Sequence, residues 1–408
     1  MAGVDAIPWI RELAQVTASK IMLVVLDGVG GLPQTPGGPT ELAAARTPNL
    51  DALARISALG LHDPVYPGLA SGSGPGHLSL FGYDPFTYQV GRGVLSALGI
   101  GVELGTGDVA VRGNFATLNS AGQVSDRRAG RPPTSENQRV VAKLRQTIQE
   151  VLDVPVEIYS ESEHRFVLIL RGELWGEVSD TDSQKTGVPP LLAEPLDERS
   201  AQAAQVLNAF SQAAQAVLAD EPKINGVLLR GAANQPKLPS LQENYLISPA
   251  CVASYPMYKG VSRLVGMEVL PVEGEGDAIA GKLATLRSNW ERFDFFFVHI
   301  KKTDSTAEDG NFDAKVAKIE EFDAMLPELL NLGPEVMLIT GDHSTPSILK
   351  AHSWHPVPVL LHGPWLRNDR ATRFTEDEAL LGSLGRLHGP ELMPLMLAHA
   401  GKLIKFGA

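Results

Sequence analysis

The sequence has a single cysteine, no long hydrophobic run and no excess of positive charge. Cys251 alone cannot form a disulfide within the chain or a cysteine-rich metal site, and we expect it to be a buried, small apolar residue. No apolar stretch approaches the ~20 residues that a membrane-spanning helix needs. The N-terminal residues lack the basic and long apolar regions of a signal peptide, so we expect a cytoplasmic protein.

The formal net charge of the chain is −12, which leaves no global positive field to attract polyanions. We therefore expect neither nucleic acid nor a membrane surface as a partner. A small anionic substrate would need a local basic pocket. The length of 408 residues predicts about two domains, and the hydrophobic fraction of 44% is enough for a large core.

Short apolar runs alternate with amphipathic segments at both ends of the chain. The run KIMLVVLD ends in an acid and is followed by a glycine-rich turn, as expected of a strand buried on both faces. Thr47 and Pro48 then begin a helical pattern. Alternating strands and helices predict a mostly parallel sheet flanked by helices. The predicted strands are 20–27, 293–300, 335–340 and 356–361, and 312–332 is a predicted helix between two of them.

The middle of the chain, residues 113–244, is richer in arginine, glutamine, serine and glutamate. Its helices are more polar and its apolar runs are weaker. We expect a smaller inserted α/β domain here, with the core formed by residues 1–112 and 245–408. One continuous large sheet is the alternative.

Acidic residues and histidines follow the predicted core strands where those strands end. Ligands of parallel α/β sheets bind outside the carboxyl ends of the strands, so these side chains can converge. Carboxylates and imidazoles together suit Mn²⁺, Mg²⁺ or Zn²⁺, and two such ions would need about six to eight ligands. His299 is equally compatible with a core histidine, and His355 is a weaker candidate. The expected ligands are Asp27, Asp304, Glu308, Asp342, His343 and His352.

A glycine-rich loop, PGLASGSGPGHLSLFGYDP at 67–85, carries Ser71, Ser73 and Ser79. Glycines let a backbone approach a phosphate without clashes from Cβ atoms. Beside two metal ions, a serine hydroxyl could attack phosphorus and form a phosphoserine. The loop alone does not say which of the three serines would react.

The order of motifs resembles the alkaline phosphatase superfamily and, within it, the archaeal-type cofactor-independent phosphoglycerate mutases. The resemblance covers most of the chain. GRGVLSALGIGVEL and DRRAGR are specific to this branch, whereas GDHSTP with HxxxPVP is shared more widely. It implies an alkaline-phosphatase-like α/β core with an inserted lid domain. The motifs, in order, are VVLDGVGGLP, HLSLFGYDP, QVGRGVLSALGIGVEL, GDVAVRGNFAT, DRRAGR, HRFVLILRG, SDTD, LLRG, HIKKTD, GDHSTP and HSWHPVPV.

The resemblance also implies roles for individual residues. Ser73 would carry the phosphoryl group, and Lys259 and Arg230 would assist at the phosphate. One metal would lie among Asp27, Ser73, Asp342 and His343, and the second among Asp304, Glu308 and His352. Either Asp180 or Asp182 would hold substrate hydroxyls or transfer protons. The expected substrate-binding residues are Arg128, Arg131, His164, Arg165, Asp180 and Asp182.

Two positions depart from the family's pattern. Gly74 stands where an acid usually follows the serine, and Glu308 stands where histidine is usual. A glutamate ligand is harder than histidine and adds negative charge, so we expect Mn²⁺ or Mg²⁺ rather than Zn²⁺.

The resemblance implies interconversion of 2- and 3-phosphoglycerate in glycolysis and gluconeogenesis, without 2,3-bisphosphoglycerate. The expected partner is this small phosphoglycerate, and a homo-oligomer is an open alternative to a monomer. Two other functions remain: a phosphatase or mutase acting on another sugar phosphate, and a non-catalytic metal-binding homologue.

Overall fold

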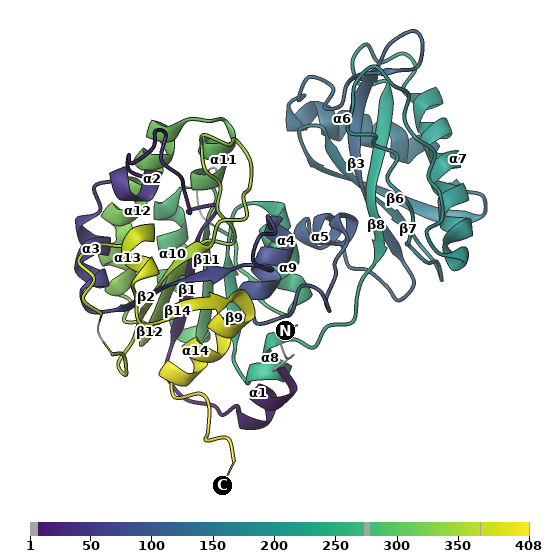
Figure 1. The fold of residues 1–408 in the computed structure, drawn as a ribbon. Coiled ribbons are helices and arrows are strands. Elements are labelled where there is room, and N and C mark those ends of the chain that lie inside the picture. Colours follow the sequence, from purple (N-terminus) through teal and green to yellow (C-terminus); the bar gives the residue numbers. More distant parts are fainter. Residues whose placement is uncertain (1–6, 273–277, 368, 408) are drawn as a thin grey trace. The chain divides into compact units, whose positions relative to one another are not determined.

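The computed structural model describes residues 7–272, 278–367 and 369–407. The chain divides into two compact units (Figure 1). The core unit is Met1–Gln89 with Leu238–Ala408, and the inserted unit is Val90–Lys237. The expected core includes residues 1–6 and 273–277, which lie outside the described residues.

The junctions differ from the expected boundaries at 113 and 244. The inserted unit begins at Val90 because α5 (Arg92–Gly99) packs on its sheet. A boundary at 113 would also cut through β3 (Val109–Leu118), a single strand. The polar composition of the middle segment therefore predicted the insertion, but it did not predict that α5 and the first part of β3 belong to it.

The core unit is built on an eight-stranded sheet in the order β10-β9-β11-β1-β12-β13-β2-β14. β13 runs antiparallel to both neighbours, and every other adjacent pair is parallel. The expected mostly parallel α/β core is thus confirmed. The strands are β1 (Ile21–Leu26), β2 (Ala58–Asp63), β9 (Pro249–Val252), β10 (Glu268–Val269), β11 (Phe295–Ile300), β12 (Val336–Thr340), β13 (Val357–His362) and β14 (Gly385–His388).

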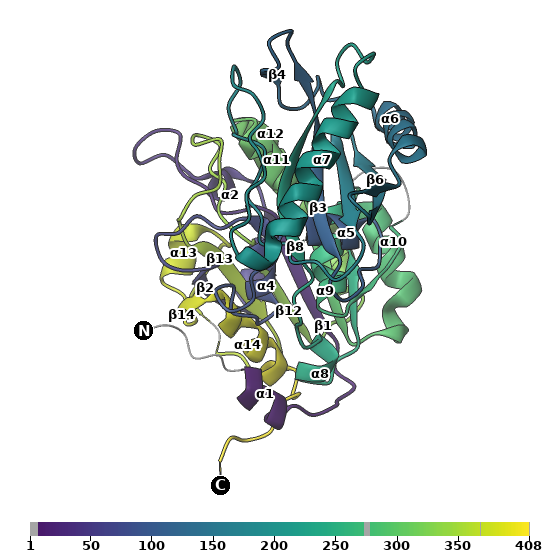
Figure 2. The ribbon, with the colours of Figure 1, turned by 90° about the vertical axis from the view of Figure 1, so that its right-hand side faces the viewer.

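Helices cover both faces of this sheet, which explains why its central strands are buried along their whole length (Figure 1 and Figure 2). One face forms a large apolar core with α2 (Glu41–Ala44), α3 (Pro48–Ala54), α10 (Ile279–Asn289), α12 (Phe312–Leu330) and α13 (Glu376–Leu380). The other face carries α4 (Ser73–Leu80), α9 (Pro256–Leu264) and α14 (Leu392–His399) (Figure 1). Shorter helices are α1 (Ile7–Leu13), α8 (Leu241–Tyr245) and α11 (Lys302–Glu308).

The inserted unit has its own six-stranded sheet, so the alternative of one continuous sheet is wrong for the described residues. All strand pairs in it are antiparallel. α6 (Thr134–Thr147) and α7 (Ala201–Val217) bury apolar side chains against one face, and α5 contacts the other. Besides β3, the strands are β4 (Val124–Asp126), β5 (Glu150–Val151), β6 (Val154–Ser162), β7 (Arg165–Leu170) and β8 (Gly226–Asn234).

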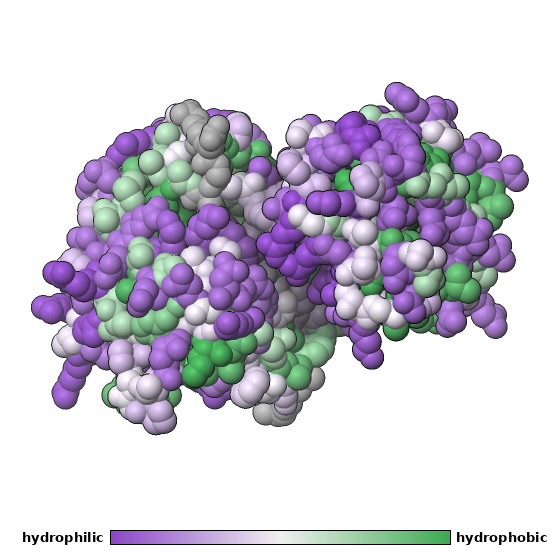
Figure 3. Space-filling view, turned by 90° about the horizontal axis from the view of Figure 1, so that it is seen from above, coloured by the Kyte–Doolittle hydropathy of each residue, from purple (hydrophilic) through white to green (hydrophobic). Residues whose placement is uncertain are grey.

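The surface seen in Figure 3 is mostly hydrophilic in both units, with hydrophobic residues interspersed. Among the described helices, none combines the length and hydrophobicity that crossing a lipid bilayer would require.

Candidate active site

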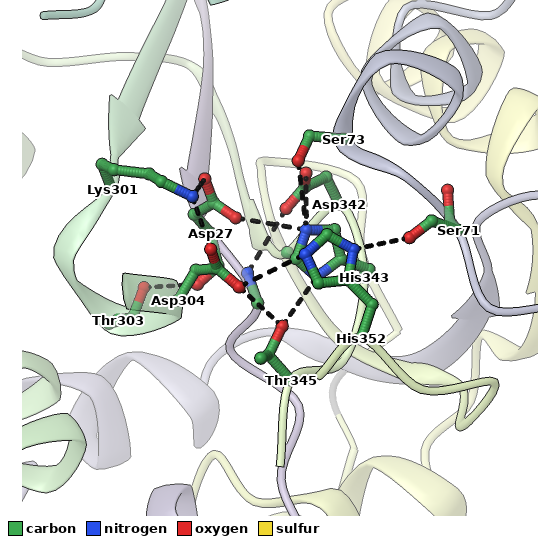
Figure 4. Close-up of polar contacts among 12 residues, drawn as sticks. Asp27, Ser71, Ser73, Lys301, Thr303, Asp304, Asp342, His343, Thr345 and His352 are labelled. Atoms are coloured by element: carbon green, nitrogen blue, oxygen red, sulfur yellow. Dashed lines mark hydrogen bonds and ion pairs between the residues drawn. The ribbon is translucent and has the colours of Figure 1, made fainter. Parts of the chain in front are cut away.

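The candidate site lies at the carboxyl ends of three neighbouring strands of the core sheet. Asp27 follows β1, Asp304 lies in α11 after β11, and Asp342 and His343 follow β12. Because β1 pairs in parallel with both β11 and β12, these side chains meet at one edge of the sheet (Figure 4).

The first candidate metal cluster is Asp27, Asp342 and His343, whose ligand atoms all lie within 4.8 Å of one another. His343 Nε2 is 3.3 Å from Asp27 Oδ1 and 3.3 Å from Asp342 Oδ2. The hydroxyl of Ser73 lies 3.3 Å from the same nitrogen. All three ligand side chains are fully buried, so their charges are poorly screened.

The second candidate cluster is Asp304, His343 and His352. The rings of the two histidines stack with centroids 3.6 Å apart, and His352 Nε2 lies 3.6 Å from Asp304 Oδ1. The carboxylate of Glu308 is at the edge, 3.9 Å from His352 Nε2, and is about half exposed. Burial, and then the charge of Asp304, raise the pKa of Glu308. Glu308 therefore lies next to this cluster but is not one of its three members.

Hydrogen bonds fix the tautomers of both histidines. The single proton of the Thr345 hydroxyl goes to Asp304 Oδ1 at 2.8 Å, because a carboxylate only accepts. His343 Nδ1, 2.9 Å from Thr345 Oγ1, must therefore be the donor in that contact. His352 Nδ1 likewise donates to the carbonyl of Ser71 at 2.8 Å. In the neutral rings both Nε2 atoms are bare, as they are in histidines that bind metals.

A bare nitrogen facing carboxylates is repulsive unless a cation lies between them. Burial lowers the pKa of His343, so the ring is neutral at pH 7. Asp27 Oδ1 is buried and has no hydrogen-bond donor among the described residues. The nearest donor to the buried Asp342 Oδ2 is His77 Nδ1 at 3.2 Å, which also contacts the carbonyl of Ser73 at 2.7 Å. Unpaired buried acceptors are costly, and divalent ions bind this combination of oxygen and nitrogen donors. The residues present therefore fit a metal-binding role.

Asp27 is held on its other side by three side chains. Tyr258 donates its hydroxyl proton to Asp27 Oδ2, and Lys301 Nζ and His299 Nε2 each lie 3.1 Å from that oxygen. Burial alone would raise the pKa of Asp27, but Lys301 and His299 outweigh it and hold the pKa well below the usual range. Lys301 also donates to Asp304, so it bridges the two clusters.

Ser73 is the first residue of α4, where the helix dipole favours negative charge on the side chain. Gly76 explains why the helix can approach so closely: a Cβ there would lie 2.4 Å from the carbonyl oxygen of Asp342. His77 fastens the same turn, donating from Nδ1 to the carbonyl of Ser73 at 2.7 Å. Burial disfavours the charged form of His77, but Asp342 and Asp27 reverse this and raise the pKa.

The other serines of the glycine-rich loop lie elsewhere. Ser71 donates its hydroxyl proton to the carbonyl of Gly72 and uses its own carbonyl to hold His352. Ser79 is buried within α4. Of the three serines, Ser73 is therefore the one that presents its hydroxyl to the clusters.

His299, Lys259 and Cys251 differ in their surroundings. His299 is fully buried and stacks on the ring of Tyr258, as a core histidine would, but it also contacts Asp27. Lys259 follows Tyr258 on α9 and is half-buried, and its role at a phosphate stays a prediction. Cys251 is buried in β9, and burial raises the pKa of its thiol to about 12.

Arginines gather on the face of the inserted sheet opposite α6 and α7. Arg112 of β3 pairs directly with Arg230 of β8, and Arg165 begins the neighbouring strand β7. His164 is buried beside them, and its pKa is lowered to about 3. Burial is the largest cause, followed by the charges of Arg165, Arg128, Arg112 and Arg131. This neutral histidine thus lies within a strongly positive field.

The two aspartates of SDTD have different surroundings. Asp182 is buried and accepts from Arg127 through both oxygens, at 2.9 and 2.7 Å. Asp180 accepts from the backbone of Gly231 at 2.7 Å, and its side chain is 38% exposed. Asp180 is therefore the one with a carboxylate open to a ligand.

Sequence reasoning did not select Tyr258, Thr345, Arg92 or Arg112. Arg92 begins α5, and burial and the charge of Arg230 lower its pKa. Both arginines lie within the motifs QVGRGVLSALG and GDVAVRGNFAT, so a search for basic residues inside them could have found them. Nothing in local sequence distinguishes Tyr258 or Thr345, which reach the site only through the fold.

The fold and the clusters define a two-unit α/β protein with two candidate metal sites, and comparison with known proteins gives the family. Residues 54–225 match the family model described as 2,3-bisphosphoglycerate-independent phosphoglycerate mutase. The chain is 66% identical to a probable mutase of this name from Thermus thermophilus, over 99% of this chain and 100% of the relative. It therefore belongs to the 2,3-bisphosphoglycerate-independent phosphoglycerate mutases, an enzyme family, and the resemblance inferred from the motifs is confirmed.

Other relatives agree over the full length. A probable mutase from Deinococcus radiodurans is 58% identical over 99% of this chain and 100% of its own. A solved structure from Pyrococcus horikoshii has 33% identity and a TM-score of 0.83, covering 96% of this chain and 100% of that one. The cofactor-independent phosphoglycerate mutase of Thermoplasma acidophilum has 31% identity and a TM-score of 0.70, covering 94% and 100%.

Divalent ions should stabilise the core unit, because they compensate the unpaired oxygens of Asp27 and Asp342. After chelation, free Mn²⁺ at 100 times its dissociation constant should add ~2.7 kcal/mol per site to the free energy of unfolding. Calorimetry measures this as a rise in melting temperature. Asp342→Asn should lose about half of the rise, because Asp342 belongs to only one of the two clusters, whereas Asp63→Asn, which alters a pair with Arg386 outside the clusters, should keep all of it. An equal rise in both variants would contradict the assignment.

Proposed function

We propose that this protein interconverts 2- and 3-phosphoglycerate through a phosphoserine at Ser73, with two divalent ions at the clusters. The observation that carries the proposal is the hydroxyl of Ser73, 3.3 Å from the bare Nε2 of His343, which both clusters share. Family membership supports the reaction, and the site geometry supports the serine.

The first cluster would hold one ion through Asp27, Asp342 and His343, and the second would hold another through Asp304, His343 and His352. Bound ions would neutralise phosphate oxygens and favour ionisation of the serine hydroxyl. Glu308 stands close enough to His352 to join the second site after a side-chain rotation.

In the first half-reaction, the Ser73 oxygen forms a bond to phosphorus as the bond from phosphorus to the substrate oxygen breaks. That oxygen takes a proton and becomes a glycerate hydroxyl. In the second half-reaction, the other hydroxyl of glycerate loses a proton and attacks phosphorus, and the serine oxygen is released. The start of α4 favours the negative charge of the phosphoserine.

The inserted unit would bind the anionic substrate. Guanidinium groups form paired hydrogen bonds with carboxylate and phosphate, and phosphoglycerate has both. Arg112, Arg230 and Arg165 share one face of the sheet, with Arg128 and Arg131 close enough to shift the pKa of His164. Such a unit would act as a lid that keeps water from the phosphoserine and retains glycerate.

Asp180 would transfer protons to and from the glycerate hydroxyls, because its carboxylate is partly exposed whereas that of Asp182 is tied to Arg127. Lys259 would assist at the phosphate from the core unit. A free metabolite as substrate also agrees with a cytoplasmic location.

Replacing the nucleophile should abolish the reaction. We expect Ser73→Ala to lower kcat by at least ~10³-fold, because neither other serine of the loop presents its hydroxyl to the clusters. Ser71→Ala and Ser79→Ala serve as matched controls and should stay within a few-fold of wild type, since Ser71 holds His352 with its backbone carbonyl. The assay supplies 3-phosphoglycerate without bisphosphoglycerate and measures 2-phosphoglycerate. Release of inorganic phosphate instead would favour a phosphatase.

Substitutions of Asp180 and Asp182 should have different effects on activity and stability. Asp180→Asn should lower kcat by ~10²-fold or more and leave the melting temperature nearly unchanged, because it removes an acid–base group. Asp182→Asn should lower the free energy of unfolding by about 2 kcal/mol, because it weakens a charged pair with Arg127. A large loss of kcat without destabilisation in Asp182→Asn would reverse the assignment.

Metal preference can be measured on the chelated enzyme. With a carboxylate at Glu308 beside the second cluster, Mn²⁺ or Mg²⁺ should restore the highest kcat, and Glu308→His should shift the preference toward Zn²⁺. Highest activity of the wild type with Zn²⁺ would contradict the predicted preference for Mn²⁺ or Mg²⁺. No activity with any of these ions would remove the metal-dependent mechanism itself.

A further inference from the structure

A buried lysine occupies the apolar face of α12. The side chains that this helix buries recur at helical spacing, and Lys315 takes a position where the pattern calls for an apolar residue, four residues before Ile319. Lys315 is fully buried and lies in the first turn, where the helix dipole disfavours a cation. Lys315 thus departs both from the apolar pattern of the helix and from the charge preference of its first turn. Such departures are common at functional positions.

The ammonium group of Lys315 is fully engaged by backbone carbonyls. It donates to Gly28 at 2.9 Å, to Gly30 at 3.0 Å and to Thr345 at 2.9 Å. These bonds use all three of its protons, and charged donors make stronger hydrogen bonds than neutral ones. The cost of burying the charge is thereby offset.

The three carbonyls belong to the two loops that carry the first metal cluster. Gly28 directly follows Asp27, and Thr345 lies two residues after His343. Thr345 also fixes the tautomer of His343 and contacts Asp304 through its hydroxyl. Its amide donates to the carbonyls of Gly28 and Gly30, so Lys315 reinforces a direct junction between the loops.

Two acidic side chains, of which Glu41 is fully buried, hold the same two loops by their amides. Glu41 accepts from the amide of Ser347 at 2.7 Å and from that of Leu32 at 3.2 Å. Glu376 accepts from the amide of Gly31 at 3.0 Å. The loops are thus fixed through backbone groups by three ionisable side chains that are not members of either cluster.

We propose that Lys315 is a positioning residue that holds the loop after β1 against the loop after β12 and thereby sets the affinity for divalent metal ions. It does so from behind the ligands, without contacting a metal or substrate. This inference rests on the proposed metal-dependent function.

The test is Mn²⁺ binding to the chelated full-length protein, measured by titration calorimetry. Lys315→Met keeps the length and apolar stem of the side chain but removes the three donors. We expect it to weaken Mn²⁺ binding by about 10- to 100-fold, the range typical of groups that orient metal ligands.

Lys402→Met is the matched control. Lys402 is equally buried and donates to Thr17 at 3.0 Å and Asp294 at 2.8 Å, beside the amino ends of β1 and β11. It should lose comparable stability but bind Mn²⁺ within about threefold of wild type. Equal Mn²⁺ affinity in Lys315→Met and Lys402→Met would overturn the inference alone. A wild type that binds no Mn²⁺ would overturn the proposed metal function and this inference with it.

Hydrogen exchange of the metal-free wild type tests the same link if Lys315→Met does not fold. Peptides covering 28–32 and 341–347 should exchange at the rate of the peptide covering 312–320, because Lys315 makes them open together. Loop peptides that exchange more than about tenfold faster than the α12 peptide would overturn the proposal.

Discussion

Three buried carboxylates at one edge of the core sheet impose the constraint on which the rest of the site depends. Asp27, Asp304 and Asp342 are each almost fully buried, and parallel pairing of β1 with β11 and β12 forces them together. Their mutual repulsion is poorly screened inside a protein. Neighbouring side chains offset part of this repulsion. Lys301 lies between Asp27 and Asp304, and Tyr258 and Thr345 each donate a hydroxyl proton to one of these two acids.

The charges of these aspartates are not compensated at every carboxylate oxygen. Donors reach Asp27 from the side of Lys301 and Tyr258, whereas its Oδ1 and Asp342 Oδ2 face the bare nitrogen of His343. A protein that needed only a stable core would place apolar side chains here. Incomplete compensation among buried charged groups distinguishes a binding site from a fully satisfied buried polar network.

Much of this could be predicted from sequence because strand ends are visible in it. Apolar runs ending in Asp27 or preceding Asp342 predicted the strands and the residues that gather at their ends, and the motifs gave the family. The boundary at 113 failed because composition changes gradually, while α5 joins the inserted sheet through close packing of Gly93 against the backbone of Ala110. Tyr258 and Thr345 could not be found, since their relation to Asp27 and Asp304 exists only after folding.

Local clusters of charge in both units are not apparent from the net charge of −12. The core unit gathers carboxylates, and the inserted sheet places Arg112 directly opposite Arg230. Like charges paired across strands are destabilising, and the carboxylates of Asp180 and Asp182, 3.5 and 3.6 Å from Arg230, offset part of this repulsion. A substrate with a phosphate and a carboxylate would relieve the repulsion among the arginines, just as divalent ions would relieve that among the aspartates. Each unit therefore carries a local concentration of like charge that its own side chains offset only in part.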